Sequence, residues 1–141
     1  MMLRSIFIAL VAIGVFAHRT PAQATTAAPS AVGVWRGTSL CLVRPSPCHD
    51  EVVVYRITRL KASDSLSLDA RKIVNAREEE MGVLACALGA RGRSITCTMR
   101  NGVWHFTVRG DSLVGELRLP NSTKFRDVRT ARHLSRSREV E

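Results

Sequence analysis

Aromatic residues are scarce in this chain of 141 residues, which has only four Phe, two Trp and one Tyr. Two of the seven, Phe7 and Phe16, lie in the apolar N-terminal segment, so five are left for the rest of the chain. Protein interiors are packed to high density, and aromatic side chains contribute much of the buried area. Five such side chains are few for a wide interior, and the scarcity is therefore compatible with an internal cavity.

Long apolar runs are also lacking. The main run covers residues 6–17, about a dozen residues, whereas a transmembrane helix needs about 20. Arg4 precedes this run, and the small-x-small sequence Ala22-Gln23-Ala24 follows it, which together are typical of a secretory signal peptide. We therefore expect residues 1–24 to be removed, no transmembrane segment, and a secreted or periplasmic protein that begins at Thr25.

Motifs of catalysis and cofactor binding are missing from the sequence, which has no nucleophile elbow, HExxH motif, P-loop or Gly-rich dinucleotide fingerprint. The Cys residues are separated by six and ten residues within each neighbouring pair and lack the Cys-x2-Cys knuckle of structural zinc sites. The sequence indicates a protein that is not an enzyme and that has no catalytic residues, no metal site and no cofactor.

Basic residues dominate the charge, although Lys is rare: 18 of the 21 basic residues are Arg. Without residues 1–24, the chain keeps 117 residues (141 − 24) and a net charge of +7 (19 basic minus 12 acidic). No cluster of Arg and Lys alternates with aromatic residues, so we expect no nucleic-acid binding. The charge leaves attraction to acidic glycans, to an anionic envelope surface or to an acidic partner protein open.

Short segments of alternating apolar residues predict antiparallel strands, because Gly, Pro, Asn and Asp separate them at intervals of about 8 to 15 residues. Asn101-Gly102 is a type I′ hairpin signal, and Gly110-Asp111, Pro120-Asn121 and residues 89–92 mark further turns. Residues 75–81, with three consecutive Glu, fit either one helical turn or an exposed loop. We expect eight strands, at residues 32–42, 50–60, 65–73, 82–88, 94–100, 103–108, 112–119 and 123–132.

The four Cys are expected to form disulfides, which is the default in an oxidising compartment. A turn at residues 89–92 sets Cys86 opposite Cys97 in a hairpin, where the Cα atoms of a non-hydrogen-bonded pair lie about 4.5 Å apart. Cys41 and Cys48 flank a loop that contains Pro45 and Pro47. We therefore predict two hairpin disulfides, Cys41–Cys48 and Cys86–Cys97.

Eight neighbouring strands in about 110 residues must avoid free edges, and closing the first strand onto the last is a common solution. Gly33-Val34-Trp35 resembles the Gly-x-Trp motif that opens the lipocalin and calycin barrels. Arg129 or Arg132 lies where those families place an Arg against that Trp. The chain has neither their Thr-Asp-Tyr motif nor their C-terminal helix, and its size is closer to avidins and to small secreted barrel inhibitors of bacterial proteases.

The resemblance implies an all-β, eight-stranded antiparallel up-and-down barrel of lipocalin-like type. Segments 37–41, 48–55 and 104–111 also resemble a family of small exported bacterial proteins that has no assigned function. We expect a flexible leader at residues 25–30, the β-barrel domain at residues 31–133 and a polar tail at residues 134–141.

Alternation along the predicted strands places Trp35, Tyr55, Trp104 and Phe106 on apolar faces. These side chains either fill the core or line a cup that holds a small apolar or amphipathic ligand. The first functional hypothesis is a non-enzymatic binding protein for such a ligand. The alternative is a protein-binding module, such as an inhibitor that inserts its N-terminal arm or its loop at residues 45–47 into an exported hydrolase.

Overall fold

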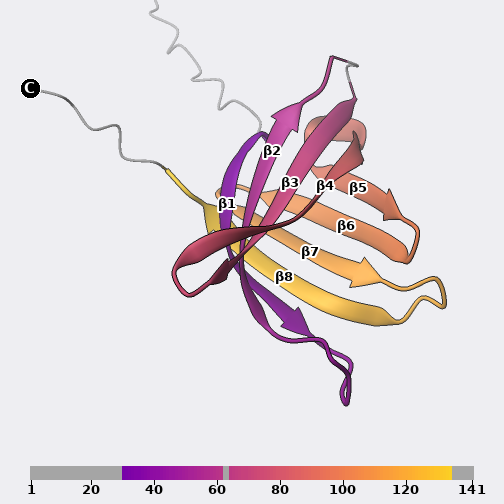
Figure 1. Ribbon diagram of the computed structural model, residues 1–141. Coiled ribbons are helices and arrows are strands. Elements are labelled where there is room, and N and C mark those ends of the chain that lie inside the picture. The colour runs from indigo at the N-terminus through magenta and orange to yellow at the C-terminus, as the bar shows by residue number, and fades with distance from the viewer. Residues whose placement is uncertain (1–29, 62–63, 135–141) are drawn as a thin grey trace, which may run out of the picture.

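The computed structural model describes residues 30–61 and 64–134. Eight antiparallel strands follow one another around a closed up-and-down barrel, in which β1 also pairs with β8 (Figure 1). The predicted signal peptide, most of the predicted leader and nearly all of the predicted tail lie outside the described residues. The strands are β1 (Gly33–Cys41), β2 (Glu51–Arg59), β3 (Ser65–Val74), β4 (Arg77–Leu88), β5 (Ser94–Met99), β6 (Gly102–Arg109), β7 (Ser112–Arg118) and β8 (Lys124–Arg132), and one short 3-10 helix, η1 (Ala90–Gly92), joins β4 to β5.

The predicted fold class is confirmed, and seven of the eight strands agree with the sequence prediction to within one residue at each end. Both predicted disulfides are present: Cys41 is bonded to Cys48 and Cys86 to Cys97, with Cα–Cα distances of 5.9 and 4.3 Å. Alternation and turn chemistry therefore located seven of the eight strands and paired the cysteines correctly.

The fourth strand begins earlier than predicted, and the expectation of a helical turn or loop at residues 75–81 is wrong. Asn75 and Ala76 are the two central residues of a tight hairpin turn with φ values of 49° and 62°, which is the type I′ pattern. The three Glu continue as the start of β4, opposite Ile73, Lys72 and Arg71 of β3. Pairing across the hairpin overrides the helix propensity of the Glu run, because cross-strand contacts stabilise a sheet more than local preference opposes it.

The predicted type I′ turn at Asn101-Gly102 is also wrong in detail. Met99 pairs with Gly102, so the turn consists of Arg100 and Asn101, and neither has a positive φ. Gly102 is instead the first residue of β6, where a Cβ atom would lie 2.5 Å from the carbonyl oxygen of Arg118. The glycine is needed there for the close approach of β7 and not for the turn.

One end of the barrel is closed by Trp35, which is buried. Its indole N–H donates to the Ala31 carbonyl at 2.9 Å, and the Arg132 guanidinium lies 4.2 Å from the centre of the ring. Arg132 also donates to the carbonyls of Ser30 and Val32. The predicted contact between a C-terminal Arg and Trp35 is thus confirmed for Arg132, whereas the Arg129 side chain is largely exposed. We call this region the closed end.

The opposite end is open, because the β3–β4 hairpin bends away from the hairpins β5–β6 and β7–β8 (Figure 1). The β3–β4 register shifts between Ala70 and Arg71, which leaves Met81 as an extra residue on β4. Near the hairpin tip, Glu78 accepts two hydrogen bonds from Arg56 of β2, at 2.7 and 3.0 Å. A bulge and an ion pair therefore fix the outward bend of this hairpin.

Candidate binding site

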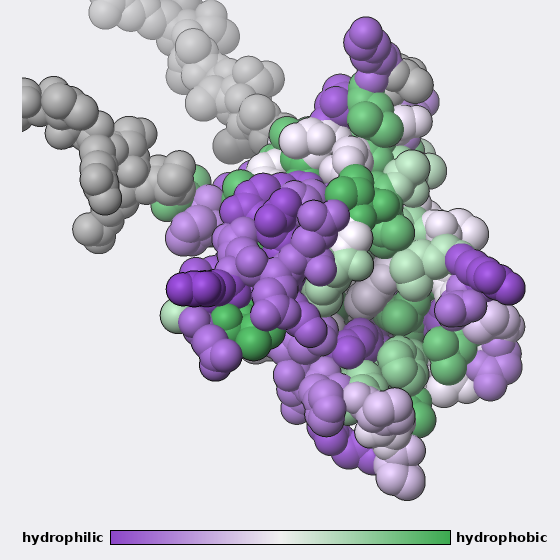
Figure 2. Space-filling view, viewed as in Figure 1, coloured by the Kyte–Doolittle hydropathy of each residue, from purple (hydrophilic) through white to green (hydrophobic). Residues whose placement is uncertain are grey.

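A cavity of about 130 Å³ lies between β4 and the neighbouring strands β5 and β6, toward the open end. We call it the seam cavity. Figure 2 shows apolar surface in the middle of this face and hydrophilic residues gathered to its left. The wall of the cavity is almost entirely apolar, and its nine lining residues are Tyr55, Leu68, Ala70, Met81, Gly82, Leu84, Met99, Trp104 and Phe106.

Three aromatic side chains form one wall of the seam cavity. Trp104 and Phe106, two residues apart on β6, point to the same side of the sheet, and their rings stack with centres 5.4 Å apart and planes 10° apart. The Tyr55 ring meets Phe106 edge-on at 5.6 Å. Phe106 has room because its ring lies against Gly115 of β7, where a Cβ atom would collide with it. Phe106 and Tyr55 are buried and Trp104 is half-buried, so Trp104 is the aromatic residue nearest to solvent.

The structure brings together three of the four ligand-binding residues that the sequence predicts, namely Tyr55, Trp104 and Phe106. Trp35 does not line the cavity, because it packs beneath Arg132 at the closed end. The wall contributed by β3, β4 and β5 was not predicted from the sequence. Alternation in β3 could have indicated Leu68 and Ala70, but no local signal showed that β4 and β5 separate.

The seam cavity opens where β4 and β5 part. These strands pair only through Ala87 with Thr96 and Leu88 with Ile95, and the disulfide Cys86–Cys97 lies directly beyond these pairs. From Arg77 to Ala85, β4 faces no strand on this side within residues 30–61 and 64–134. The disulfide therefore marks the point at which the seam begins to open.

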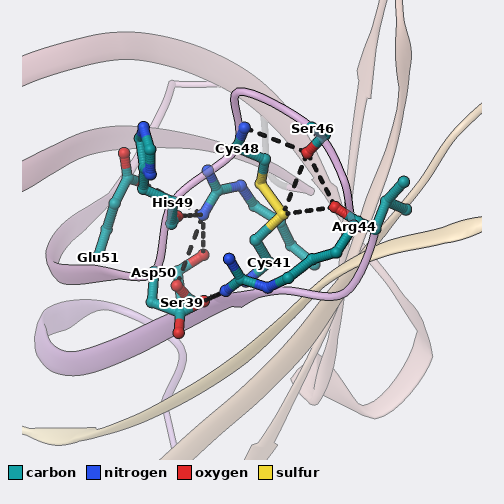
Figure 3. A network of polar contacts seen from close by, with 10 residues as sticks. Ser39, Cys41, Arg44, Ser46, Cys48, His49, Asp50 and Glu51 are labelled. Carbon is teal, nitrogen blue, oxygen red and sulfur yellow. Dashed lines mark hydrogen bonds and ion pairs between the residues drawn. A yellow bond between two sulfur atoms is a disulfide. The ribbon is translucent and has the colours of Figure 1, made fainter.

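Tyr55 also links the cavity to a polar network at the open end. Burial raises the pKa of its hydroxyl above the usual value, against the opposing effect of the nearby Arg126 charge. Arg126, whose side chain is only 13% exposed, donates to Ser39 Oγ at 3.1 Å and to the His49 carbonyl at 3.2 Å, and pairs with Glu51 at 3.3 Å. This network ties β1, β2 and β8 together (Figure 3).

The loop between β1 and β2 is braced from within (Figure 3). The disulfide Cys41–Cys48 closes its base, and the Asp50 carboxylate accepts a hydrogen bond from the Cys41 N–H at 2.8 Å and pairs with Arg44 at 3.2 Å. Ser46 Oγ donates to the Val43 carbonyl and accepts from the Cys48 N–H. The loop is thus held by contacts within itself, and such preorganisation lowers the entropic cost of binding a partner.

A second hollow, of about 240 Å³, lies on the outer face of β6, β7 and β8. It is less apolar, and its two carboxylates already have partners: Glu116 pairs with Arg118 and Lys124, and Asp127 pairs with Lys124 at 2.8 Å. These ion pairs hold the pKa of both carboxyl groups below their usual values. The hollow is therefore explained by the packing of the sheet surface.

The chemistry available in the seam cavity is apolar contact. No carboxylate, amine or imidazole lines it, and the described residues contain no group of three or more His, Cys, Asp or Glu arranged to hold a metal ion. The same residues include no helix that is long and apolar enough to cross a membrane. Comparison with known proteins finds no matching family model, no matching curated protein and no matching solved structure.

Proposed function

We propose that this protein is a non-enzymatic binding protein that takes a small apolar group into the seam cavity. The observation that carries the proposal is the cavity itself, which is apolar, bounded by three aromatic rings and open to solvent along the seam. Apolar pockets with few polar groups are the usual sites for small ligands. The two disulfides are compatible with a protein that functions in an oxidising compartment, either outside the cell or in the periplasm.

The cavity volume limits the size of the group that enters. A dry apolar cavity of about 150 Å³ accepts benzene, and the seam cavity has about 130 Å³. A single ring or a short alkyl branch therefore fits inside. The remainder of a larger amphipathic ligand would lie outside the seam, where Met81 and Val83 expose apolar surface.

Toluene is a suitable probe, with two-dimensional NMR of the side-chain methyl groups as the readout. We expect one saturable site, with the largest shifts at Leu68, Leu84 and Met99. Ala70→Leu fills the cavity and should abolish these shifts without loss of folding, since it adds apolar volume to an empty space. Ala87→Leu is the matched control, because Ala87 is exposed on the outer face of β4. Equal binding by both variants would exclude the seam cavity as the site.

A second candidate function rests on the braced β1–β2 loop. We propose as the alternative that this loop inserts into an exported partner protein such as a hydrolase. Arg44→Glu or deletion of residues 45–47 should then abolish capture of that partner and leave toluene binding unchanged. The Ala70→Leu variant should lose toluene binding. If it still captures the partner, the two activities belong to separate sites.

A further inference from the structure

Strand β4 is the longest strand of the barrel and the least supported on one side. It pairs with β3 from Arg77 to Ala87, whereas it pairs with β5 only at Ala87 and Leu88. Most of its second edge therefore faces no strand among the residues that the structure describes. A long free edge is unusual, since natural sheets cover, shorten or charge such edges to prevent uncontrolled pairing.

The backbone groups that point into the open seam follow from the hydrogen bonds at the end of β4. The Leu88 N–H donates to the Asp64 carbonyl on the β3 side, and the next residue, Gly89, donates to Ser94 on the β5 side, each at 2.8 Å. Backbone groups of successive strand residues point to alternate sides. The N–H and C=O groups of Val83 and Ala85 therefore point into the seam.

The seam cavity lies directly beside these backbone groups. Gly82 and Leu84, which alternate with Val83 and Ala85 along β4, both line the cavity. Apart from Gly82 itself and its two chain neighbours, no residue has an atom within 4 Å of the position that a Cβ atom of Gly82 would take. In a strand paired with β4, the side chains opposite Gly82 and Leu84 would point to the inner side of the sheet, toward this empty space.

The charge beside the free edge is opposite to that of the molecule. Residues 77–80 (Arg-Glu-Glu-Glu) have a net charge of −2 in a chain of net charge +9. Arg56 engages Glu78 at 2.7 Å and Lys72 lies 3.9 Å from Glu79, whereas Glu80 has no ion pair among the described residues. A basic residue of a partner would therefore find an available carboxylate at Glu80.

From these observations we propose that β4 accepts an extended peptide segment of a partner protein by strand addition. The segment pairs with the backbone of Val83 and Ala85, inserts one apolar side chain into the seam cavity, and places a Lys or Arg beside Glu80. Strand addition combines backbone hydrogen bonds, which give affinity, with a side-chain pocket, which gives specificity. The inference rests on the proposed function, because the same cavity receives the apolar group.

A second copy of this chain fits the edge less well. Symmetric antiparallel pairing of residues 77–85 with themselves is centred on Met81, which is the bulged residue of β4. A bulge at the centre of both strands would interrupt the regular ladder of backbone hydrogen bonds between them. The edge therefore favours a partner of different sequence.

The test begins with a random heptapeptide library displayed on phage and selected on the oxidised protein. We expect enriched sequences with a Phe, Leu or Met, β-branched neighbours and a Lys or Arg. The most enriched peptide, synthesised with blocked termini, is then the probe. Amide exchange at Val83 and Ala85 should be fast in the free protein and at least about tenfold slower with saturating peptide, since each gains a backbone hydrogen bond. The Val108 amide, already bonded to the Arg93 carbonyl, is the internal control.

N-methylated peptides separate backbone pairing from contact by side chains alone. Methylation of the amides that face β4 should weaken binding at least about tenfold, and methylation of the alternate amides should change it less than about twofold, because only the first set donates to the edge. Glu80→Lys should weaken binding of the basic peptide and favour a peptide with Glu in place of its Lys. Asp64→Lys, in the exposed turn at the closed end, is the matched control.

Three results would overturn the inference: no enriched peptide, binding that is insensitive to all N-methylations, or protection confined to the β1–β2 loop. If toluene still binds in any of these cases, the cavity function stands and only strand addition is wrong. If toluene and peptide both fail to bind, the proposed function is wrong as well.

Discussion

Trp35 and Arg44 show how differently single residues contribute to this molecule. Trp35 is buried between the core and the Arg132 guanidinium, and truncation of a buried Trp to Ala costs about 3 to 5 kcal/mol. The Arg44 side chain is 59% exposed and makes one ion pair with Asp50, which is worth about 0 to 1 kcal/mol. We expect Trp35→Ala to lower the melting temperature far more than Arg44→Ala, as measured by thermal unfolding of the oxidised protein. Similar melting temperatures would contradict the packing of the closed end.

Tyr55 is the only Tyr in the chain, so its ionisation can be followed by the ultraviolet absorbance of tyrosinate. Burial raises its pKa in the folded protein, whereas an unfolded Tyr ionises near its usual pKa of about 10. Below pH 10 both states bind the proton, and above it the unfolded state loses the proton first. Folding stability should therefore decrease as the pH rises above about 10.

The Tyr55→Phe variant serves as the control for this pH dependence. It has no phenol to ionise and should show a smaller loss of stability above about pH 10. Urea should return the absorbance titration of the wild-type protein to the usual midpoint. A normal midpoint in the folded protein would mean that Tyr55 is not buried in the cavity wall.

At the scale of the element, the β3–β4 hairpin contains an unfavourable residue in its turn. Ala76 has a φ of 62°, a left-handed conformation that costs an L-residue about 1 to 2 kcal/mol. Glycine adopts this conformation without that cost. Its greater freedom in the unfolded chain, however, lowers the free energy of unfolding by about 0.4 to 1 kcal/mol. Ala76→Gly should therefore raise the free energy of unfolding by about 0.5 kcal/mol, measured in urea. Destabilisation would show that the turn is not of type I′.

The elements also show where prediction from sequence ends. Strands with clear alternation and turn residues were predicted, because both signals are local. The Glu run of β4 was not, since its support comes from Lys72 of β3 and Arg56 of β2. Trp35 and Trp104 look alike in the sequence, as each occupies an inward position, and only the packing of Arg132 separates a core residue from one that lines the cavity. The bulge at Met81 places this residue and its neighbour Gly82 on the same wall, which simple alternation excludes.

At the scale of the whole molecule, closure of the barrel depends on a short contact. Seven of the eight strand junctions have long ladders, and the eighth, between β4 and β5, has two residue pairs and a disulfide. The seam is therefore both the entrance to the cavity and the weakest part of the barrel wall. A binding site that must admit a ligand is expected in such a region of low local stability.

The two disulfides offer a matched test of this view, because their loops have similar sequence separations of 7 and 11 residues. By chain entropy alone each bond contributes about 2 to 3 kcal/mol. Replacing Cys41 and Cys48 by Ser opens only the β1–β2 loop, whereas replacing Cys86 and Cys97 by Ser leaves two residue pairs to hold β4 against β5. We expect the second variant to lose more stability in urea and to show faster amide exchange at Thr96 and Ala87, which pair across the seam. Equal losses, with exchange at the seam unchanged, would show that the barrel closes without help from Cys86–Cys97 and that the seam does not limit its stability.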